Sequence, residues 1–137
     1  EVKIAFLMFD CDRFKSINDK FGHPVGDEVL RHIVRVIKPD LRSADYIVRY
    51  GGDEFLLVLP ETDEVAAQVV ANRVIKDVAE SQVPNGEGGF ISLSVSLGVE
   101  VIPASRVGTD PKHAAAIWEE FCKDADEKMY KSKRGEA

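Results

Sequence analysis

The most constraining feature of the sequence is a nearly unbroken apolar run near its start, Val2 to Phe9 (VKIAFLMF), which Asp10-Cys11-Asp12 follows at once. An apolar run of this length predicts a strand buried on both faces, because a strand with one wet face would alternate apolar and polar residues. The two aspartates then stand at the end of a central strand. We therefore expect the chain to build its sheet around this segment.

Composition narrows the class of protein. The 137 residues suit one domain with its own core and leave no room for two. A hydrophobic content of 45% excludes a disordered chain, and a charged content of 31%, without an apolar run near the roughly 20 residues that cross a bilayer, excludes a membrane protein. The net charge of −6 is a weak argument against a protein that coats nucleic acid. Carboxylates that hold metal ions could still serve a polyanionic substrate.

The two cysteines, Cys11 and Cys122, are far apart in the sequence and form no C-x-x-C motif. This usage is typical of a reducing, cytosolic compartment, and no disulfide between them is expected. The sequence starts without a methionine, almost directly in a strand, and ends just beyond a predicted helix. We therefore expect residues 1–137 to be a single domain of a longer protein, whose targeting or membrane-anchoring segments would lie elsewhere.

The rest of the chain alternates helix-type and strand-type patterns. After the first strand, the predicted elements are a short helix with a turn, a helix, a hairpin, a helix, a long strand and a last helix, at 10–24, 25–38, 46–59, 63–81, 90–102 and 112–133. Thr62 is predicted to cap the helix after it, and a flexible loop, Pro84–Gly89, precedes the long strand. The buried side of the helix 63–81 is predicted to carry Val65, Val69, Val70, Val74 and Val78.

The predicted order of elements is β-α-α-β-β-α-β-α. It contains a βαββαβ unit, the split βαβ or ferredoxin-like plan. We therefore expect an α+β fold in which helices flank a central, mostly antiparallel sheet. In this sheet the first strand is expected to pair with the strand that follows the first helical segment.

Two acidic segments are predicted to meet at one end of the sheet. Asp10-Cys11-Asp12 ends the first strand, and Gly51-Gly52-Asp53-Glu54 forms the tip of the hairpin. Oxygen ligands from two strand ends suit hard divalent cations, and two such ions can activate an attacking hydroxyl and stabilise a leaving phosphate. Either segment alone would fit solvated turn carboxylates. Together, with glycines that let the backbone approach a ligand closely, they favour a metal site.

Four motifs resemble those of the GGDEF domain, the diguanylate cyclase family. They are, in chain order, Phe9–Asp27 (FDCDRFKSINDKFGHPVGD), Arg49–Phe55 (RYGGDEF), Ser94–Val99 (SVSLGV) and Ala125–Lys133 (ADEKMYKSK). The match spans nearly the whole chain. It implies that two GTP molecules condense into cyclic di-GMP with loss of two pyrophosphates. In this family two domains meet face to face, and each 3′-hydroxyl attacks the other's α-phosphate.

The resemblance implies a metal-dependent catalytic site. Asp10, Asp53 and the main-chain carbonyl of Cys11 match the metal ligands, and Glu54 would assist the second of two Mg²⁺ ions, for which Mn²⁺ could substitute. Asp53 also matches the residue proposed to accept the 3′-hydroxyl proton. Lys15 would neutralise phosphate charge, although it could be an ordinary exposed lysine. The family usually has an aliphatic residue in place of Cys11, so its thiol is expected to be a small buried apolar group.

Other residues match the family's substrate contacts. Asn18 and Asp27 match the pair that reads guanine, in which a carboxylate accepts from N1–H and the exocyclic amine and an amide satisfies the other edge. Asp27 thereby favours cyclic di-GMP over a mixed GMP-AMP product. His23 and Gly51-Gly52 match positions near the substrate, and Lys133 matches a triphosphate-binding lysine. Helix-dipole charges at Asp27 and Lys133, and a turn histidine at His23, are the alternatives.

Arg42-Ser43-Ala44-Asp45 has the R-x-x-D form and the position of the family's inhibitory site. In the family, the product binds there and restrains the domain. An arginine can donate two hydrogen bonds to guanine O6 and N7 or to a phosphate. An ordinary surface ion pair between Arg42 and Asp45 is the alternative.

The sequence departs from the family at both ends. The family's D-x-L-T-x-L-x-N-R segment before the first strand and its G-R-N-R segment after the closing lysine are absent. The phosphate contact of that later arginine therefore cannot be assigned to a residue, and we expect an isolated domain that is largely monomeric and weakly active. The expected partners are GTP, cyclic di-GMP and a second GGDEF domain in a transient homodimer. No nucleic-acid polymer or membrane contact is expected for this domain.

Two other functions remain open at this stage. A GGDEF-type module could bind GTP or cyclic di-GMP and regulate a partner without catalysis, but the intact hairpin and Asp10 favour an enzyme. Another nucleotidyl cyclase or a polymerase-palm enzyme would have a similar sheet and two-metal chemistry. The hairpin sequence and the pair Asn18 and Asp27 argue against that second alternative.

Overall fold

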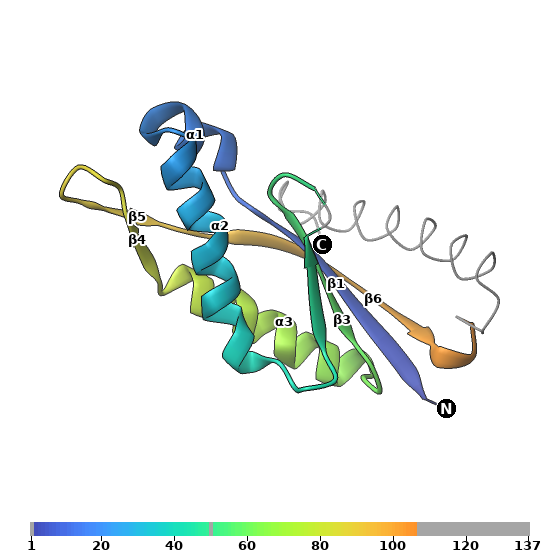
Figure 1. Cartoon of the computed structure of the whole chain (residues 1–137). Helices are drawn as coiled ribbons and strands as arrows, with labels where there is room; N and C mark the ends of the chain where they lie inside the picture. Colours follow the sequence, from blue (N-terminus) through green and yellow to red (C-terminus); the bar gives the residue numbers. More distant parts are fainter. Residues whose placement is uncertain (1, 50, 107–137) are drawn as a thin grey trace.

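The computed structural model describes residues 2–49 and 51–106. A four-stranded sheet in the order β2-β3-β1-β6 lies at its centre, and every neighbouring pair of strands is antiparallel (Figure 1). The elements are β1 (Lys3–Cys11), α1 (Phe14–Phe21), α2 (His23–Ile37), η1 (Lys38–Asp40), β2 (Tyr46–Arg49), β3 (Glu54–Leu59), α3 (Glu64–Ala79), β4 (Gln82–Pro84), β5 (Phe90–Ser92), β6 (Val95–Pro103) and η2 (Ala104–Arg106). The predicted α+β fold is confirmed.

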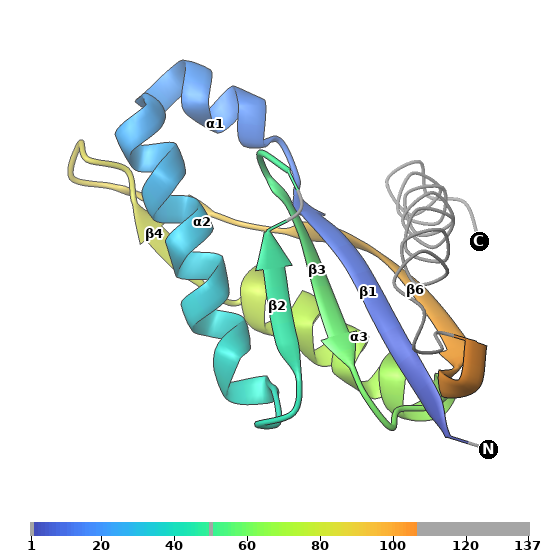
Figure 2. The same ribbon diagram turned by 45° about the vertical axis from the view of Figure 1, so that its right-hand side comes forward.

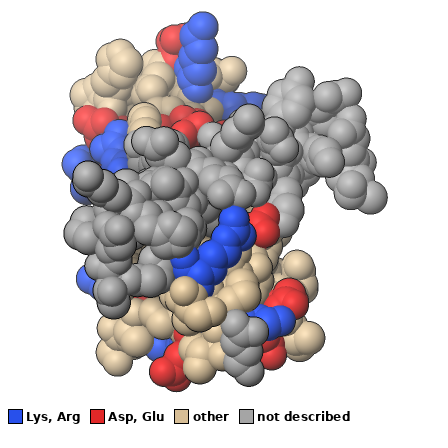
Figure 3. Space-filling view, turned by 90° about the vertical axis from the view of Figure 1, so that its right-hand side faces the viewer, with Lys and Arg blue, Asp and Glu red and all other residues tan. Residues whose placement is uncertain are grey.

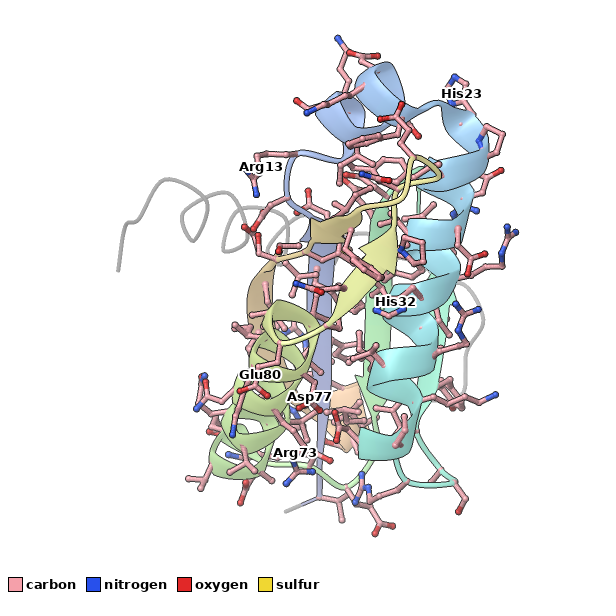
Figure 4. The ribbon with its side chains drawn as sticks, turned by 90° about the vertical axis from the view of Figure 1, so that its left-hand side faces the viewer. Arg13, His23, His32, Arg73, Asp77 and Glu80 are labelled. Atoms are coloured by element: carbon pink, nitrogen blue, oxygen red, sulfur yellow. The ribbon has the colours of Figure 1, made fainter. Side chains whose placement is uncertain are left out.

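The apolar run forms the central strand, as predicted. β1 lies between β3 and β6, and every residue from Ala5 to Cys11 is buried. Successive side chains of a strand point to opposite faces, and the odd-numbered residues of β1 join the core with α2 and α3. Both helices lie on that one face of the sheet (Figures 2 and 4). Asp10 is an even-numbered residue and therefore belongs to the opposite face.

The predicted neighbour of the first strand is wrong. β1 pairs with β3, whereas β2, which follows the helical segment, is the outer neighbour of β3. A right-handed crossover through a helix brings β2 alongside β1 in the same direction and leaves a gap of one strand, which β3 fills by turning back in a hairpin. The two acidic strand ends still meet, because the register pairs Asp10 with Glu54.

α3 buries a different stripe from the one predicted. Val65 and Val69 are 75% and 50% exposed, which corrects the prediction that both are buried. The residues of α3 that enter the core are Ala67, Ala71, Val74 and Val78. Small alanines let the helix approach the sheet closely. In the first half of α3, the alanines and not the valines therefore pack into the core.

The start of α3 also differs from the prediction. Asp63, and not Thr62, is the N-cap, since its Oδ1 accepts a hydrogen bond of 2.9 Å from the Ala66 amide. The Thr62 hydroxyl donates to the carbonyl of Pro60 at 2.9 Å and accepts from Arg42. Thr62 therefore connects the end of β3 to the segment that contains Arg42.

The predicted flexible loop Pro84–Gly89 is the tip of a second hairpin, formed by β4 and β5. The Asn85 side chain organises this tip, because its Oδ1 accepts from the amides of Glu87 and Gly89 at 2.7 and 3.1 Å. The predicted long strand is interrupted between β5 and β6, where the Ser94 carbonyl accepts a hydrogen bond from the Asp12 amide at 3.0 Å. The last predicted helix, with Cys122 and Lys133, lies outside the described residues. Within them, no helix has the length and apolarity to cross a membrane.

Two carboxyl groups meet where η1 packs beside α3. Burial, together with the neighbouring Asp77 carboxyl, raises the pKa of Asp40 to about 6, and Arg73 opposes this increase. Asp40 Oδ2 is buried and accepts no hydrogen bond from a described donor that would stabilise its ionised form. Figure 4 shows Arg73 and Asp77 on the side of α3 that faces the end of α2.

This pair predicts a pH-dependent contribution to stability. The folded state binds the proton of Asp40 more tightly than the unfolded state does, so this contribution is present at low pH and is lost as the pH rises through about 6. Asp77→Asn should therefore raise the free energy of unfolding near neutral pH by about 1 kcal/mol relative to the wild type, and by less at acidic pH. Urea denaturation at both pH values measures this difference. A variant whose advantage is the same at both pH values would contradict the raised pKa of Asp40.

Candidate active site

The acidic segments form one corner of the molecule, where β1 ends and β3 begins. Asp10, which is 5% exposed, is the register partner of Glu54, and the Cys11 amide donates to the carbonyl of Asp53 at 3.4 Å. The Gly51 amide donates to the carbonyl of Glu54 at 3.3 Å, which closes the hairpin turn. The structure therefore brings the backbones of the predicted metal-site residues together where β1 ends, where β3 begins and in the turn before β3.

Arg49 holds the glycine turn from one side. Its Nε donates to the carbonyls of Gly51 and Gly52 at 3.3 and 3.1 Å, and its Nη2 donates to the carbonyl of Gly52 at 2.7 Å. A cationic donor on two adjacent carbonyls restrains a turn that glycine would otherwise leave free. This role of Arg49 was not predicted from the sequence. The signal that the sequence offers for it is an arginine two residues before the first glycine.

Asp12 has a structural role at this corner. Ser94 Oγ and Ser96 Oγ donate to its two carboxylate oxygens at 2.7 and 2.6 Å. These short, charge-assisted bonds join the end of β1 to the start of β6. Sequence reasoning grouped Asp12 with the acidic cluster, but both of its oxygens already accept hydrogen bonds from the motif SVSLGV. The remaining carboxylates of the corner are those of Asp10, Asp53 and Glu54.

The donor set of this corner fits a cation that protein and phosphate hold jointly. Among the described residues, no three side chains of His, Cys, Asp or Glu are gathered closely enough to hold a metal ion by themselves. Mg²⁺ is usually bound through one or two carboxylates together with water and substrate phosphates, so such a corner suits a metal that arrives with a nucleotide. Cys11 is 1% exposed and lies in the apolar core, which confirms the expected role of its side chain.

The residues matched to guanine recognition meet at the corner between α1 and α2. Gly22 makes this corner with a φ of 92°, a left-handed conformation that suits glycine, and its amide donates to the carbonyl of Asn18 at 2.8 Å. The Asn18 side chain reaches across to Gly26 of α2, next to Asp27. His23 is exposed at the first residue of α2 (Figure 4). Lys15 is exposed in the first turn of α1.

Arg42 and Asp45 lie at the opposite end of the sheet, where β2 begins and β3 ends. Arg42 Nη2 donates to Asp45 Oδ1 at 2.9 Å, and the Arg42 amide and Nε donate to Asp45 Oδ2 at 2.8 and 3.3 Å. Nη2 also donates to the Pro60 carbonyl at 2.5 Å and to Thr62 Oγ1 at 2.9 Å. The Asp45 carboxylate raises the pKa of Arg42. The R-x-x-D motif is therefore a closed, well-bonded unit.

A cavity of about 340 Å³ adjoins this unit. Besides Arg42 and Asp45, its lining includes Asp40, Leu59, Val69 and Arg73. Arg73 adds a second guanidinium to the lining, and no sequence motif pointed to it. The face seen in Figure 3 shows basic and acidic side chains interspersed over its described part, without a continuous basic stripe.

Comparisons with known proteins point to the family that the sequence motifs resemble. The family model "Diguanylate cyclase, GGDEF domain" matches residues 1–137. The chain is 39% identical over 131 residues to diguanylate cyclase A of Treponema denticola, a match that covers 96% of this chain and 33% of that protein.

Solved structures give the same result. The chain resembles the diguanylate cyclase SiaD of Pseudomonas aeruginosa, solved with its activator SiaC, with a TM-score of 0.83, 33% identity and coverage of 97% of this chain and 47% of that one. It resembles the GGDEF domain of DgcB from Caulobacter crescentus, solved in complex with c-di-GMP, with a TM-score of 0.80, 25% identity and coverage of 98% and 74%.

The antiparallel α+β fold and the family match place the chain in a class of nucleotidyltransferase-type domains. Within that class, the chain belongs to the GGDEF family of diguanylate cyclases. It spans about a third or less of the length of the first curated relatives that it matches. The family assignment sets aside the alternative of an unrelated polymerase-palm enzyme.

Proposed function

We propose that this chain is a diguanylate cyclase domain that condenses two GTP molecules into cyclic di-GMP and two pyrophosphates. The observation that carries the proposal is the β1–β3 register, which pairs Asp10 with Glu54 and brings the carbonyl of Asp53 to the Cys11 amide. Family membership supports the same activity. The alternative, a module that binds nucleotide without catalysis, is less favoured, because every carboxylate of the corner is present in the sequence.

In this proposal the corner binds the triphosphate and organises the reaction. Asp10, Asp53, Glu54 and the Cys11 carbonyl would hold two Mg²⁺ ions, or Mn²⁺ in their place, which would polarise the α-phosphate and neutralise charge. Asp53 takes the proton of the attacking 3′-hydroxyl. A bond forms between that oxygen and the α-phosphorus, and the bond from the α-phosphorus to pyrophosphate breaks. Lys15 stabilises the negative charge that develops on the phosphate.

The corner between α1 and α2 selects the base. Asp27 accepts hydrogen bonds from N1–H and the exocyclic amine of guanine, while the Asn18 amide meets the adjoining edge. Adenine lacks that pair of donors, so Asp27 would be left unpaired beside it. His23 and Gly51-Gly52 border the bound nucleotide. Lys133, which lies outside the described residues, is proposed to contact the triphosphate.

One site holds one GTP, so the reaction needs a second copy of the domain. Each copy supplies a nucleotide to a face-to-face homodimer, and the 3′-hydroxyl of each GTP attacks the α-phosphate of the other. The condensation therefore occurs twice and closes the ring. The rate of the reaction therefore depends on how often two domains dimerise, and a factor that controls dimerisation controls the rate.

Product inhibition is proposed at Arg42 and Asp45. The Arg42 side chain is 54% exposed although it is well bonded, so a ligand can reach its guanidinium. The Asp45 side chain is only 3% exposed and fixes the direction of that guanidinium. Cyclic di-GMP would accept hydrogen bonds from Arg42 through guanine or phosphate and fill the adjoining cavity. The GGDEF domain of DgcB was solved in complex with c-di-GMP, which gives a precedent for a GGDEF domain that binds this nucleotide.

The activity is tested with a dimerised form of the domain, incubated with GTP and Mg²⁺ after removal of any bound product. We expect cyclic di-GMP, identified by mass, and a loss of rate of at least about a hundredfold in Asp53→Ala, because the proton acceptor and a metal ligand are both removed. Arg35→Ala, an exposed change on α2, is the matched control and should retain the wild-type rate. Absence of product in the wild type would overturn the enzyme. Full activity of Asp53→Ala would overturn the assignment of the site.

The inhibitory site is tested by a titration of the same reaction with cyclic di-GMP. Arg42→Ala should raise the inhibitory concentration by at least about tenfold, because the guanidinium that meets the product is gone. Arg42→Lys should raise it as well, since an ammonium keeps the charge but not the paired donors. Thermal unfolding controls for the loss of the bonds to Asp45, Pro60 and Thr62. Unchanged inhibition in folded Arg42→Ala would remove this site from the proposal.

A further inference from the structure

Gly26 of α2 and Asn18 of α1 are in unusually close contact. A β-carbon placed on Gly26 would overlap the amide oxygen of Asn18 and would lie 2.8 Å from Cγ and 3.4 Å from Nδ2 of the same side chain. Contacts below 3.0 Å are essentially never made by real β-carbons. The Asn18 side chain therefore occupies the space that any larger residue at position 26 would need.

The backbone of α2 does not require this glycine. Gly26 does not have a positive φ, and its amide donates to the carbonyl of Gly22 at 3.1 Å within the first turn of the helix. At such a position alanine would be favoured over glycine by about 1 kcal/mol, because glycine loses more backbone entropy when a helix forms. The reason for a glycine at this position is therefore the space that it leaves for Asn18.

The amide of Asn18 is fixed by this contact. Its Oδ1 is buried and has no hydrogen-bond partner among the described residues, and within that part of the chain the group packs closely against Gly26. Asp27 follows Gly26 directly. The same turn of α2 thus carries the gap that receives Asn18 and the carboxylate proposed to read the base.

We propose that Gly26 is a positioning residue for guanine recognition: its missing side chain seats the Asn18 amide in the orientation that meets the base beside Asp27. This inference rests on the proposed function, in which Asn18 and Asp27 bind guanine. A side chain that reads a base discriminates only as well as its own orientation is fixed. Without the gap at Gly26, Asn18 would turn away and the contact with the base would be lost.

Gly26→Ala is expected to change recognition and leave the fold intact. The atoms that a β-carbon would displace are the far end of a short, flexible side chain, so Asn18 can rotate without moving either helix. The helix gains propensity from alanine. We therefore expect an unchanged or slightly higher melting temperature together with weaker binding of guanine nucleotides.

The test measures binding without turnover. A GTP analogue with a methylene group between the α- and β-phosphates is titrated by calorimetry, in the presence of Mg²⁺, into the wild type, Gly26→Ala, Asn18→Ala and the double variant. We expect about a tenfold loss of affinity in each single variant and no further loss in the double variant, because both changes remove the same contact. In steady-state assays Gly26→Ala should raise KM for GTP about tenfold with little change in kcat. Arg35→Ala is the control on α2.

The other outcomes separate the inference from the function on which it rests. Wild-type affinity in Gly26→Ala, with weakened binding in Asn18→Ala, would overturn the positioning role and leave the base site standing. Losses that add in the double variant would also overturn it, since Gly26 would then act by another route, and so would a melting temperature that falls by many degrees. If neither Asn18→Ala nor Asp27→Ala weakens binding, the guanine site of the proposed function fails, and the inference fails with it.

Discussion

The antiparallel register between β1 and β3 is the constraint on which the site depends. It pairs Asp10 with Glu54 and places Asp53, the last residue of the glycine turn, beside Cys11 at the end of β1. A slip of one residue would turn every side chain of β1 to the opposite face, so that Asp10 would enter the apolar core with α2 and α3. The cost of burying the Asp10 carboxylate in that core opposes this slip, and the hydrogen bonds of Arg49 to the carbonyls of Gly51 and Gly52 restrain the turn itself.

The two candidate sites lie at opposite ends of the same sheet. The acidic corner and the α1–α2 corner lie near the end of β1, whereas Arg42 and Asp45 lie where β2 begins. The short strand β2 and the turn held by Arg49 connect the two ends directly. A ligand at Arg42 would therefore lie one short strand away from the candidate active site.

Sequence patterns predicted the central strand, the βαββαβ order and the meeting of Asp10 with the hairpin tip, because burial and turn chemistry determine these features locally. They failed where tertiary contacts decide between similar local patterns. Val65 and Val69 look like core residues, yet the close approach of α3 to the sheet needs alanines. The bonds from Ser94 and Ser96 to Asp12 join residues far apart in the sequence, and the fit of Asn18 against Gly26 depends on the angle at Gly22. No local pattern reports such contacts.

The most direct test of the central claim is a titration of Mn²⁺ into the protein, followed by electron paramagnetic resonance, with and without the methylene GTP analogue. Within residues 2–49 and 51–106, the acidic corner gathers no three side chains close enough to hold a cation alone, so we predict weak binding without nucleotide and binding at least about tenfold tighter with it. Asp10→Asn should abolish the gain. Equally tight binding without nucleotide, or a gain that survives Asp10→Asn, would contradict a metal site shared by the ends of β1 and β3 and the phosphates.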